Sequence, residues 1–265
     1  RIERGKVRGS GTGNYGQAMP LAGGCIMHMQ NMAEVLEIGP GRVTTQPGVV
    51  IRDLDRITRD HSGQELRMMP STAGTATIGG FICGGSGGVG SVRWGLLRDY
   101  GNILRIRVAT MEAQPRILDF TGEDLARVSH AYGTNGVVTE IQMPLAPAYD
   151  WVHVFVTLPD FARAARLAHA LALQDGILLK LASVCEAPTA ARYFQRFRGH
   201  VTDQDSAIAL MVAPQSMDGF LSFLAHEPLQ HAMLHVRHIH QDQAVQHVGE
   251  LPVDIKCQQF AAKLQ

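Results

Sequence analysis

Residues 8–16 read Arg8-Gly9-Ser10-Gly11-Thr12-Gly13-Asn14-Tyr15-Gly16, so four of these nine residues are glycine. Glycine lacks a Cβ, and a run of this kind lets the chain adopt positive φ angles and lets a ligand approach the backbone closely. Successive backbone N–H groups in such a loop can form an anion-binding concavity. The run therefore predicts a loop that binds a phosphate group.

A second glycine cluster lies in residues 74–90, and hydroxyl side chains are interleaved with it. The glycines are Gly74, Gly79, Gly80, Gly84, Gly85, Gly87, Gly88 and Gly90, and the hydroxyl residues are Ser71, Thr72, Thr75, Thr77 and Ser86. One such cluster alone favours a flexible surface loop. Two clusters in one half of the chain indicate the binding of one large phosphorylated cofactor.

The six residues from Gly11 to Gly16 also satisfy the dinucleotide-binding pattern G-x-G-x-x-G. That pattern needs a buried strand before it and a helix that opens within it. Here the preceding residues 4–8 are mostly charged, and Pro20 and Gly23-Gly24 follow before a helix can form. We therefore reject a Rossmann site, and the chain has no P-loop pattern either.

The composition excludes several classes of protein. The chain has 265 residues, 45% of them hydrophobic, which is enough for a sizeable core. Lys+Arg and Asp+Glu both number 24, so no basic excess predicts a nucleic-acid partner. No apolar run reaches the ~18 residues of a transmembrane segment. Four widely spaced cysteines predict neither a disulfide framework nor a thiolate zinc site, and they suit the cytoplasm. The first residue is Arg1, so we expect a truncated chain.

Strands that alternate with helices predict a layered α/β or α+β fold, and we expect α+β. The composition changes after Pro147, which predicts two domains, residues 1–147 and 148–265. In the first domain we expect strands at 25–29, 35–38, 42–46, 103–109 and 136–143, and helices at 50–60 and 123–129. In the second we expect strands at 152–158, 177–182, 207–212 and 233–239, and helices at 161–172, 189–197 and 217–225. Asp160 is the expected N-cap of the helix that begins at 161.

Five segments in one order resemble the FAD-linked oxidases of the vanillyl-alcohol oxidase and p-cresol methylhydroxylase type. The glycolate-oxidase and D-lactate-dehydrogenase-like branch is the most similar. The segments are the 8–13 loop followed by Pro20 and Gly23-Gly24; Gln46-Pro47-Gly48-Val49; Pro70-Ser71-Thr72 with Ala76-Thr77-Ile78-Gly79-Gly80; Arg93-Trp94-Gly95 with Arg98-Asp99-Tyr100; and Gly133-Thr134-Asn135-Gly136-Val137-Val138-Thr139-Glu140.

The resemblance implies a p-cresol methylhydroxylase-type FAD-binding domain, with its N-terminal part missing. An incomplete α+β cap domain would follow, with an antiparallel sheet covered by helices. It also implies the cofactor-binding residues. These are Arg8, Gly9, Ser10, Gly11, Thr12, Gly13, Asn14, Gly16, Gln17, Pro70, Ser71, Thr72, Thr77, Gly79, Gly80, Gly84, Gly85, Ser86, Asn135, Gly136, Val137 and Val138.

Four positions depart from the family pattern. Thr12 stands where some relatives attach FAD through a histidine, so we expect non-covalent FAD. Gly85 stands where relatives often have asparagine. His130 and Tyr132 stand where many relatives have glycine and glutamate.

The sequence offers only weak candidates for catalysis. Oxidation of a hydroxy acid needs a base for the hydroxyl proton and a cation for the carboxylate. His238 and His240 are candidate bases, and Arg93 and Arg98 are candidate cations. On a strand, His235 would point away from His238 and His240, so we expect no metal site there.

The leading hypothesis is an FAD-dependent oxidoreductase that oxidises a small hydroxy acid or alcohol. The alternative is a non-catalytic or electron-transferring FAD-binding subunit of a larger oxidase complex. A third hypothesis is a metal-dependent enzyme that uses the histidines of residues 235–240. The expected partners are a small-molecule substrate and either a second copy of the chain or a partner subunit.

Overall fold

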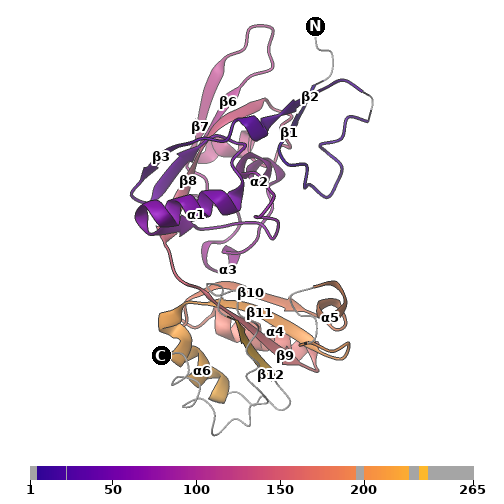
Figure 1. Cartoon of the computed structure of the whole chain (residues 1–265), viewed down its shortest axis with the longest axis vertical. Coiled ribbons are helices and arrows are strands. Elements are labelled where there is room, and N and C mark those ends of the chain that lie inside the picture. Colours follow the sequence, from indigo (N-terminus) through magenta and orange to yellow (C-terminus); the bar gives the residue numbers. More distant parts are fainter. Residues whose placement is uncertain (1–4, 22, 195–199, 227–232, 238–265) are drawn as a thin grey trace. The chain divides into compact units, whose positions relative to one another are not determined.

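A computed structural model describes residues 5–21, 23–194, 200–226 and 233–237 of the chain. The chain divides into two compact units, Arg1–Ala148 and Tyr149–Gln265. Figure 1 shows both units, with most of their helices and strands labelled. Each unit has its own sheet and its own hydrophobic core, so each is described by itself.

The first unit is built on a six-stranded antiparallel sheet with the order β3-β4-β8-β6-β7, in which β5 also pairs with β8. The strands are β3 Val35–Gly39, β4 Arg42–Thr45, β5 Gln64–Leu66, β6 Arg105–Ala109, β7 Ile117–Thr121 and β8 Val137–Pro147. The long β8 joins both halves of the sheet because β4, β5 and β6 all pair with it. The predicted strands at 35–38, 42–46, 103–109 and 136–143 all lie in this sheet, whereas β5 and β7 were not predicted.

Helix α1, Ile51–Ser62, covers the apolar side of this sheet, as the periodicity predicts. Its buried residues Ile51, Leu54 and Thr58 lie at helical spacing on one face. The helix ends at Gly63, whose φ of 63° and N–H bond to the Arg59 carbonyl close the last turn. The segment predicted as a helix at 123–129 is instead the 3₁₀ helix η2, Gly122–Arg127.

The second glycine cluster is not a continuous loop, because residues Ile78–Gly84 form helix α2. Three apolar residues of this helix, Ile78, Phe81 and Ile82, are buried in the core of the unit. Their burial overrides the low helix propensity of the intervening glycines. A short helix α3, Ser91–Trp94, follows.

A separate pair of parallel strands flanks the first glycine loop: β1, Gly5–Arg8, and β2, Cys25–His28. We did not predict β1, so a strand does precede the G-x-G-x-x-G pattern. It is not buried, however, and the described residues between β1 and β2, 9–21 and 23–24, contain no helix. The rejection of a Rossmann site therefore stands.

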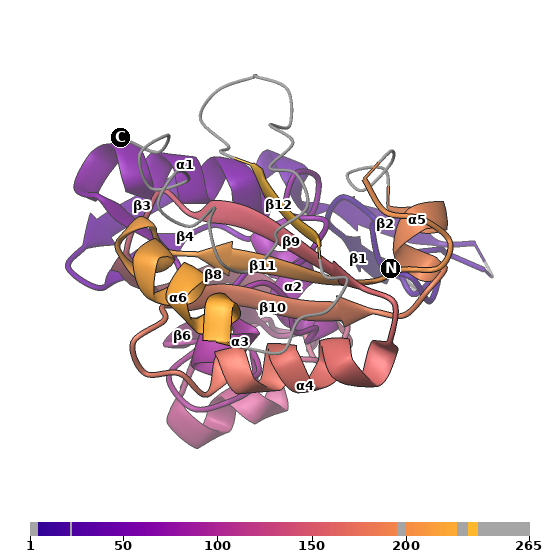
Figure 2. The same ribbon diagram turned by 90° about the horizontal axis from the view of Figure 1, so that it is seen from below.

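The second unit has a four-stranded antiparallel sheet of order β10-β11-β9-β12 (Figure 2). The strands are β9 Val152–Leu158, β10 Leu179–Cys185, β11 Ser206–Val212 and β12 Met233–Arg237. Alternate residues of β9, from Val152 to Leu158, share a core with helices α4, Phe161–Ala172, and α6, Met217–His226. Phe155 of β9 belongs instead to a smaller cluster beside α5, Thr189–Tyr193.

The predicted N-cap of α4 is confirmed, because the Asp160 carboxylate accepts a hydrogen bond from the Arg163 N–H at 2.6 Å. Residues 195–197 of the predicted 189–197 helix and residues 238–239 of the predicted 233–239 strand lie outside the described residues. Within the described part of the chain, no helix combines the length and the hydrophobicity of a membrane span.

Candidate functional site

A pocket opens in the first unit where three segments meet: the end of β1, helix α2, and the chain that leads into β8. Five of its lining residues are glycines. The lining consists of Val7, Gly9, Met29, Pro47, Thr77, Gly79, Gly80, Cys83, Tyr132, Gly133, Gly136 and Val138. Six of them were predicted as cofactor-binding residues, namely Gly9, Thr77, Gly79, Gly80, Gly136 and Val138. The pocket thus brings both predicted glycine clusters together.

Two of these glycines are required by close contact between backbone segments. An ideal Cβ on Gly9 would lie 2.2 Å from Oγ1 of Thr77, and one on Gly79 would lie 2.5 Å from Cβ of Pro47. Side chains at either position would push the first loop or α2 outward. The close packing of these segments at the pocket therefore depends on the absence of these Cβ atoms.

The first glycine loop has polar groups that the chain itself leaves unpaired. In the described residues, the backbone N–H groups of residues 10–14 have no recorded hydrogen-bond acceptor. Gly11 has a φ of 71°, which favours glycine, and the Arg8 guanidinium lies beside it. Nε of Arg8 is buried without a hydrogen-bond partner. Unpaired N–H groups and a half-buried guanidinium suit an anion such as a pyrophosphate.

The first backbone N–H groups of α2 serve the fold instead. The Gly79 N–H donates to the Pro47 carbonyl at 2.9 Å, and the Gly80 N–H donates to Oγ1 of Thr77 at 3.2 Å. Thr77 is thereby the N-cap of the helix. We infer that Gly79 and Gly80 provide room for close approach and that the anion donors are in the first loop.

Several other predicted cofactor residues do not line this pocket. Ser71 and Thr72 are exposed in the turn before α2, with Pro70 at its start. Gly84 faces open space, and Gly85 caps the end of α2 against His130. Ser86 is exposed. Asn135 donates to the Arg127 carbonyl within its own loop, and Val137 belongs to the buried part of β8. In the first loop, Oε1 of Gln17 accepts a hydrogen bond from the Tyr15 N–H at 3.1 Å, and the Gln17 side chain lies against Gly13. The remaining members, Ser10, Thr12, Asn14 and Gly16, lie on the same loop and also do not line the pocket.

Cys83 lines the pocket although the sequence analysis did not select it. Burial raises the pKa of its thiol to about 11, and the Gly133 N–H, which donates to the sulfur, opposes that shift. The thiol is therefore neutral near pH 7. Met29, Pro47, Tyr132 and Gly133 were also not selected. Pro47 and Gly133 lie within the resemblance segments, so their sequence signal was present, whereas nothing local marked Met29 or Cys83.

The predicted catalytic candidates are not in the pocket. Arg93, on α3, stacks over the Trp94 ring at 5.0 Å, and Arg67 stacks over the same ring at 4.3 Å. Burial, followed by the charge of Arg93, lowers the pKa of Arg67. Arg98 is exposed in the following turn. His238 and His240 lie outside the described residues. The described residues contain no cluster of metal-ligating side chains.

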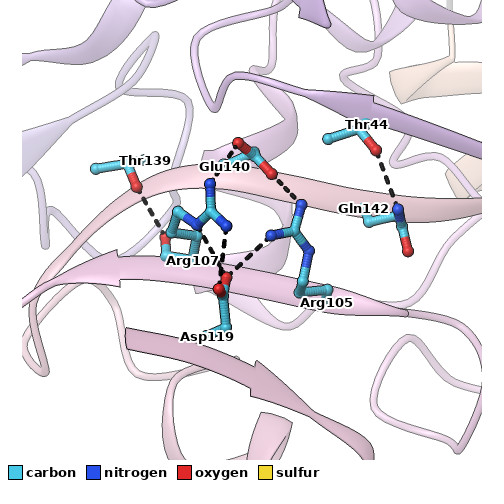
Figure 3. A network of polar contacts seen from close by, with 7 residues as sticks. All are labelled: Thr44, Arg105, Arg107, Asp119, Thr139, Glu140 and Gln142. Carbon is cyan, nitrogen blue, oxygen red and sulfur yellow. Dashed lines mark hydrogen bonds and ion pairs between the residues drawn. The ribbon is translucent and has the colours of Figure 1, made fainter. Parts of the chain in front are cut away.

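A closed network of charges covers the outer face of the first sheet (Figure 3). Arg105 and Arg107 of β6 bind Asp119 of β7 and Glu140 of β8. The Arg107 hydrogen bond, followed by the charges of Arg107 and Arg105, holds the pKa of Asp119 below its usual range. Two cations and two anions balance here, so we assign this network to the sheet and not to ligand binding.

One protein-family model matches the N-terminal part of the chain, which contains most of the pocket-lining residues. Residues 4–115 match the family model described as an FAD binding domain. The matched segment contains all the pocket-lining residues except those from residues 132–138. FAD is the cofactor that the resemblance implied, and it is a large phosphorylated molecule of the kind that the two glycine clusters predicted.

Similar proteins are longer than this chain. Glycolate oxidase subunit GlcD of Escherichia coli is 31% identical over 180 residues, which are 65% of this chain and 36% of that protein. D-lactate dehydrogenase of Archaeoglobus fulgidus is 30% identical over 151 residues, 53% of this chain and 33% of that protein. The chain thus spans about a third of the length of these relatives.

A solved structure of alkyldihydroxyacetonephosphate synthase is similar in fold. Its TM-score is 0.65 at 18% identity, and the match covers 83% of this chain and 44% of that one. The similarity therefore extends beyond the FAD-binding domain into the second unit.

Proposed function

We propose that this chain is the FAD-binding part of an oxidoreductase that oxidises a small hydroxy acid or alcohol. The observation that carries the proposal is the pocket walled by Gly9 and Gly79, within a domain of the FAD-binding family. The names of the relatives, glycolate oxidase and D-lactate dehydrogenase, support a small 2-hydroxy acid as the substrate.

The residues of this chain fit FAD in distinct ways. The free N–H groups of residues 10–14 and the buried Arg8 Nε suit the pyrophosphate. The glycine walls and Val138 suit flat ring systems, which need apolar surfaces without projecting side chains. FAD, when bound, supplies the acceptor for the hydride of the substrate.

We propose that FAD is bound without a covalent bond to the protein. Thr12 is not a nucleophile that forms such a link readily. Cys83 is the thiol in the pocket, and its raised pKa keeps it in the neutral, poorly nucleophilic form. Acid precipitation should therefore release the flavin into the supernatant, and flavin retained in the precipitated protein would contradict this proposal.

For the substrate carboxylate we propose Arg93 as the cation, with Arg98 as the second candidate. Among the described residues, neither Arg93 nor Arg67 forms an ion pair with a carboxylate, although most arginines of the first unit do. The base for the hydroxyl proton is proposed to be His238 or His240.

A second candidate function is an electron-transferring FAD subunit of a larger complex. It is favoured by the pocket lining, which contains no Asp, Glu, His, Lys or Arg within the described residues. The Escherichia coli relative is named as a subunit, which supports a partner subunit or a second copy of the chain.

One experiment separates the two functions. The purified flavoprotein is mixed anaerobically with glycolate, D-lactate and related hydroxy acids, and flavin absorbance is followed. Bleaching of the flavin by one of these acids supports the oxidoreductase. Flavin that is reduced by dithionite but by none of the hydroxy acids supports the electron-transferring subunit. A chain that takes up no FAD contradicts both.

A further inference from the structure

Two residues beside the pocket have a backbone conformation that side chains disfavour. His130 has a φ of 54° and Tyr132 a φ of 51°, and in the described residues no other non-glycine residue has a positive φ. This region is costly for residues with a Cβ, and a bulky aromatic residue there is an outlier. The surrounding contacts must therefore hold both residues in place.

The end of helix α2 supplies those contacts. The His130 N–H donates to the Ile82 carbonyl and the Tyr132 N–H donates to the Cys83 carbonyl, each at 3.0 Å. The His130 ring occupies space that is open only because residue 85 is glycine. An ideal Cβ on Gly85 would lie 2.3 Å from Cγ of His130.

The Tyr132 ring is supported from one side. Its centroid lies 5.4 Å from that of His130 in an edge-to-face arrangement at 65°, and the Tyr132 hydroxyl lies 3.3 Å from Nε2 of His130. Tyr132 is 41% exposed and lines the pocket. It is the one aromatic residue among the lining residues described above, whose other members are glycine, aliphatic, threonine, proline and cysteine.

We propose that Tyr132 is an aromatic wall of the FAD pocket and that His130 is the residue that positions its ring. This inference rests on the proposed function, because it requires FAD to occupy this pocket. A rigid ring beside a flat heterocycle adds stacking or edge contacts that glycine walls cannot make. The strained backbone persists because it places the ring at the pocket.

The test separates binding from folding. Glycine adopts a φ of 51° freely, so Tyr132→Gly removes the strain together with the ring. We expect the Tm of the apoprotein to stay unchanged or to rise, while the Kd for FAD, measured by flavin fluorescence, rises about tenfold. Tyr132→Phe keeps the ring and should bind within about twofold of the wild-type chain. Tyr100→Ala, at an exposed tyrosine outside the pocket, is the matched control and should leave the Kd unchanged.

His130 should act only through Tyr132. His130→Gly should raise the Kd for FAD about threefold in the wild-type chain and have no effect in the Tyr132→Gly chain. Wild-type affinity in Tyr132→Gly would overturn the inference, as would a loss of Tm in parallel with the loss of affinity, which would indicate a structural ring. A wild-type apoprotein that does not bind FAD would overturn the proposed function as well.

Discussion

Individual glycines set the shape of the proposed FAD pocket, and they do so for different physical reasons. Gly9 and Gly79 allow two segments to approach, because each would carry its Cβ into a neighbouring residue. Gly11 allows a positive φ. Gly84 has neither role, since its Cβ would meet open space and its φ is not positive. The glycines of one cluster are therefore not equivalent in their effect on FAD binding.

Paired substitutions to alanine should show this difference. Gly9→Ala places a methyl group against the Thr77 hydroxyl, which caps α2, so the first loop must move away from the helix. We expect the Kd for FAD to rise roughly tenfold or more. Gly84→Ala is the control and should leave the Kd unchanged, with stability equal or higher by up to about 1 kcal/mol. Equal FAD affinity in both variants would contradict the packing of Gly9 against Thr77.

At the scale of elements, strands β6, β7 and β8 use their two faces differently. Ile106 and Val108 point into the core, while Arg105 and Arg107 point to the other face and bind Asp119 and Glu140. The alternation is the ordinary consequence of strand geometry. Because each arginine bridges two strands, the network adds cross-strand ion pairs to the backbone ladder.

The pH dependence of stability should report this network. The pKa of Asp119 is lowered in the folded chain, so its contribution is present above the ordinary carboxyl pKa and is lost as the pH falls through the lowered value. Asp119→Asn should reduce the free energy of unfolding at pH 7 by less than about 1 kcal/mol, because the pair is partly exposed.

Urea unfolding should be measured at neutral pH and at a pH below the lowered pKa of Asp119. The difference in free energy of unfolding between wild type and Asp119→Asn should vanish at the acidic pH. Asp124→Asn removes an exposed i,i+3 pair with Arg127 and serves as the control, with little change at either pH. If Asp119→Asn still has a lower free energy of unfolding than wild type in acid, Asp119 stabilises strands β6 and β7 by contacts other than its ion pairs.

At the scale of the whole molecule, the two units bury separate cores. The first core includes Ile51, Ile82 and Ile141, and the second includes Val154, Leu171 and Phe220. All lining residues of the described pocket belong to the first unit. A ligand that binds only folded protein stabilises the part that contains its site.

Calorimetry of the full chain should therefore show two unfolding transitions. FAD should raise the midpoint temperature of only one of them, the unfolding of the first unit. At free FAD near 100 times its Kd, the stabilisation of that unit is about 2.7 kcal/mol. At the same FAD concentration, a tenfold higher Kd in the Gly9→Ala variant should reduce this stabilisation to about 1.4 kcal/mol. A single transition that FAD moves as a whole would show that the two units unfold together and would contradict this prediction.

The sequence alone identified the FAD-binding domain, the two glycine clusters and most strands, since these signals are local in the chain. Alternation located β6, β8, β9 and β11, and capping by Asp160 located the start of α4. The sequence did not reveal α2, because glycine is a poor helix former and only burial of Ile78 and Phe81 against the sheet stabilises the helix.

Only the tertiary structure decided which residues line the pocket. Val7, Met29, Cys83 and Tyr132 are distant from one another in the chain, and pairing of β1 with β2 and packing of α2 against residues 130–133 bring them together. Periodicity reports the face of an element that is buried, not the residue that faces it from another segment. The positive φ of Tyr132 is likewise imposed by contacts from α2, because a tyrosine by itself favours negative φ.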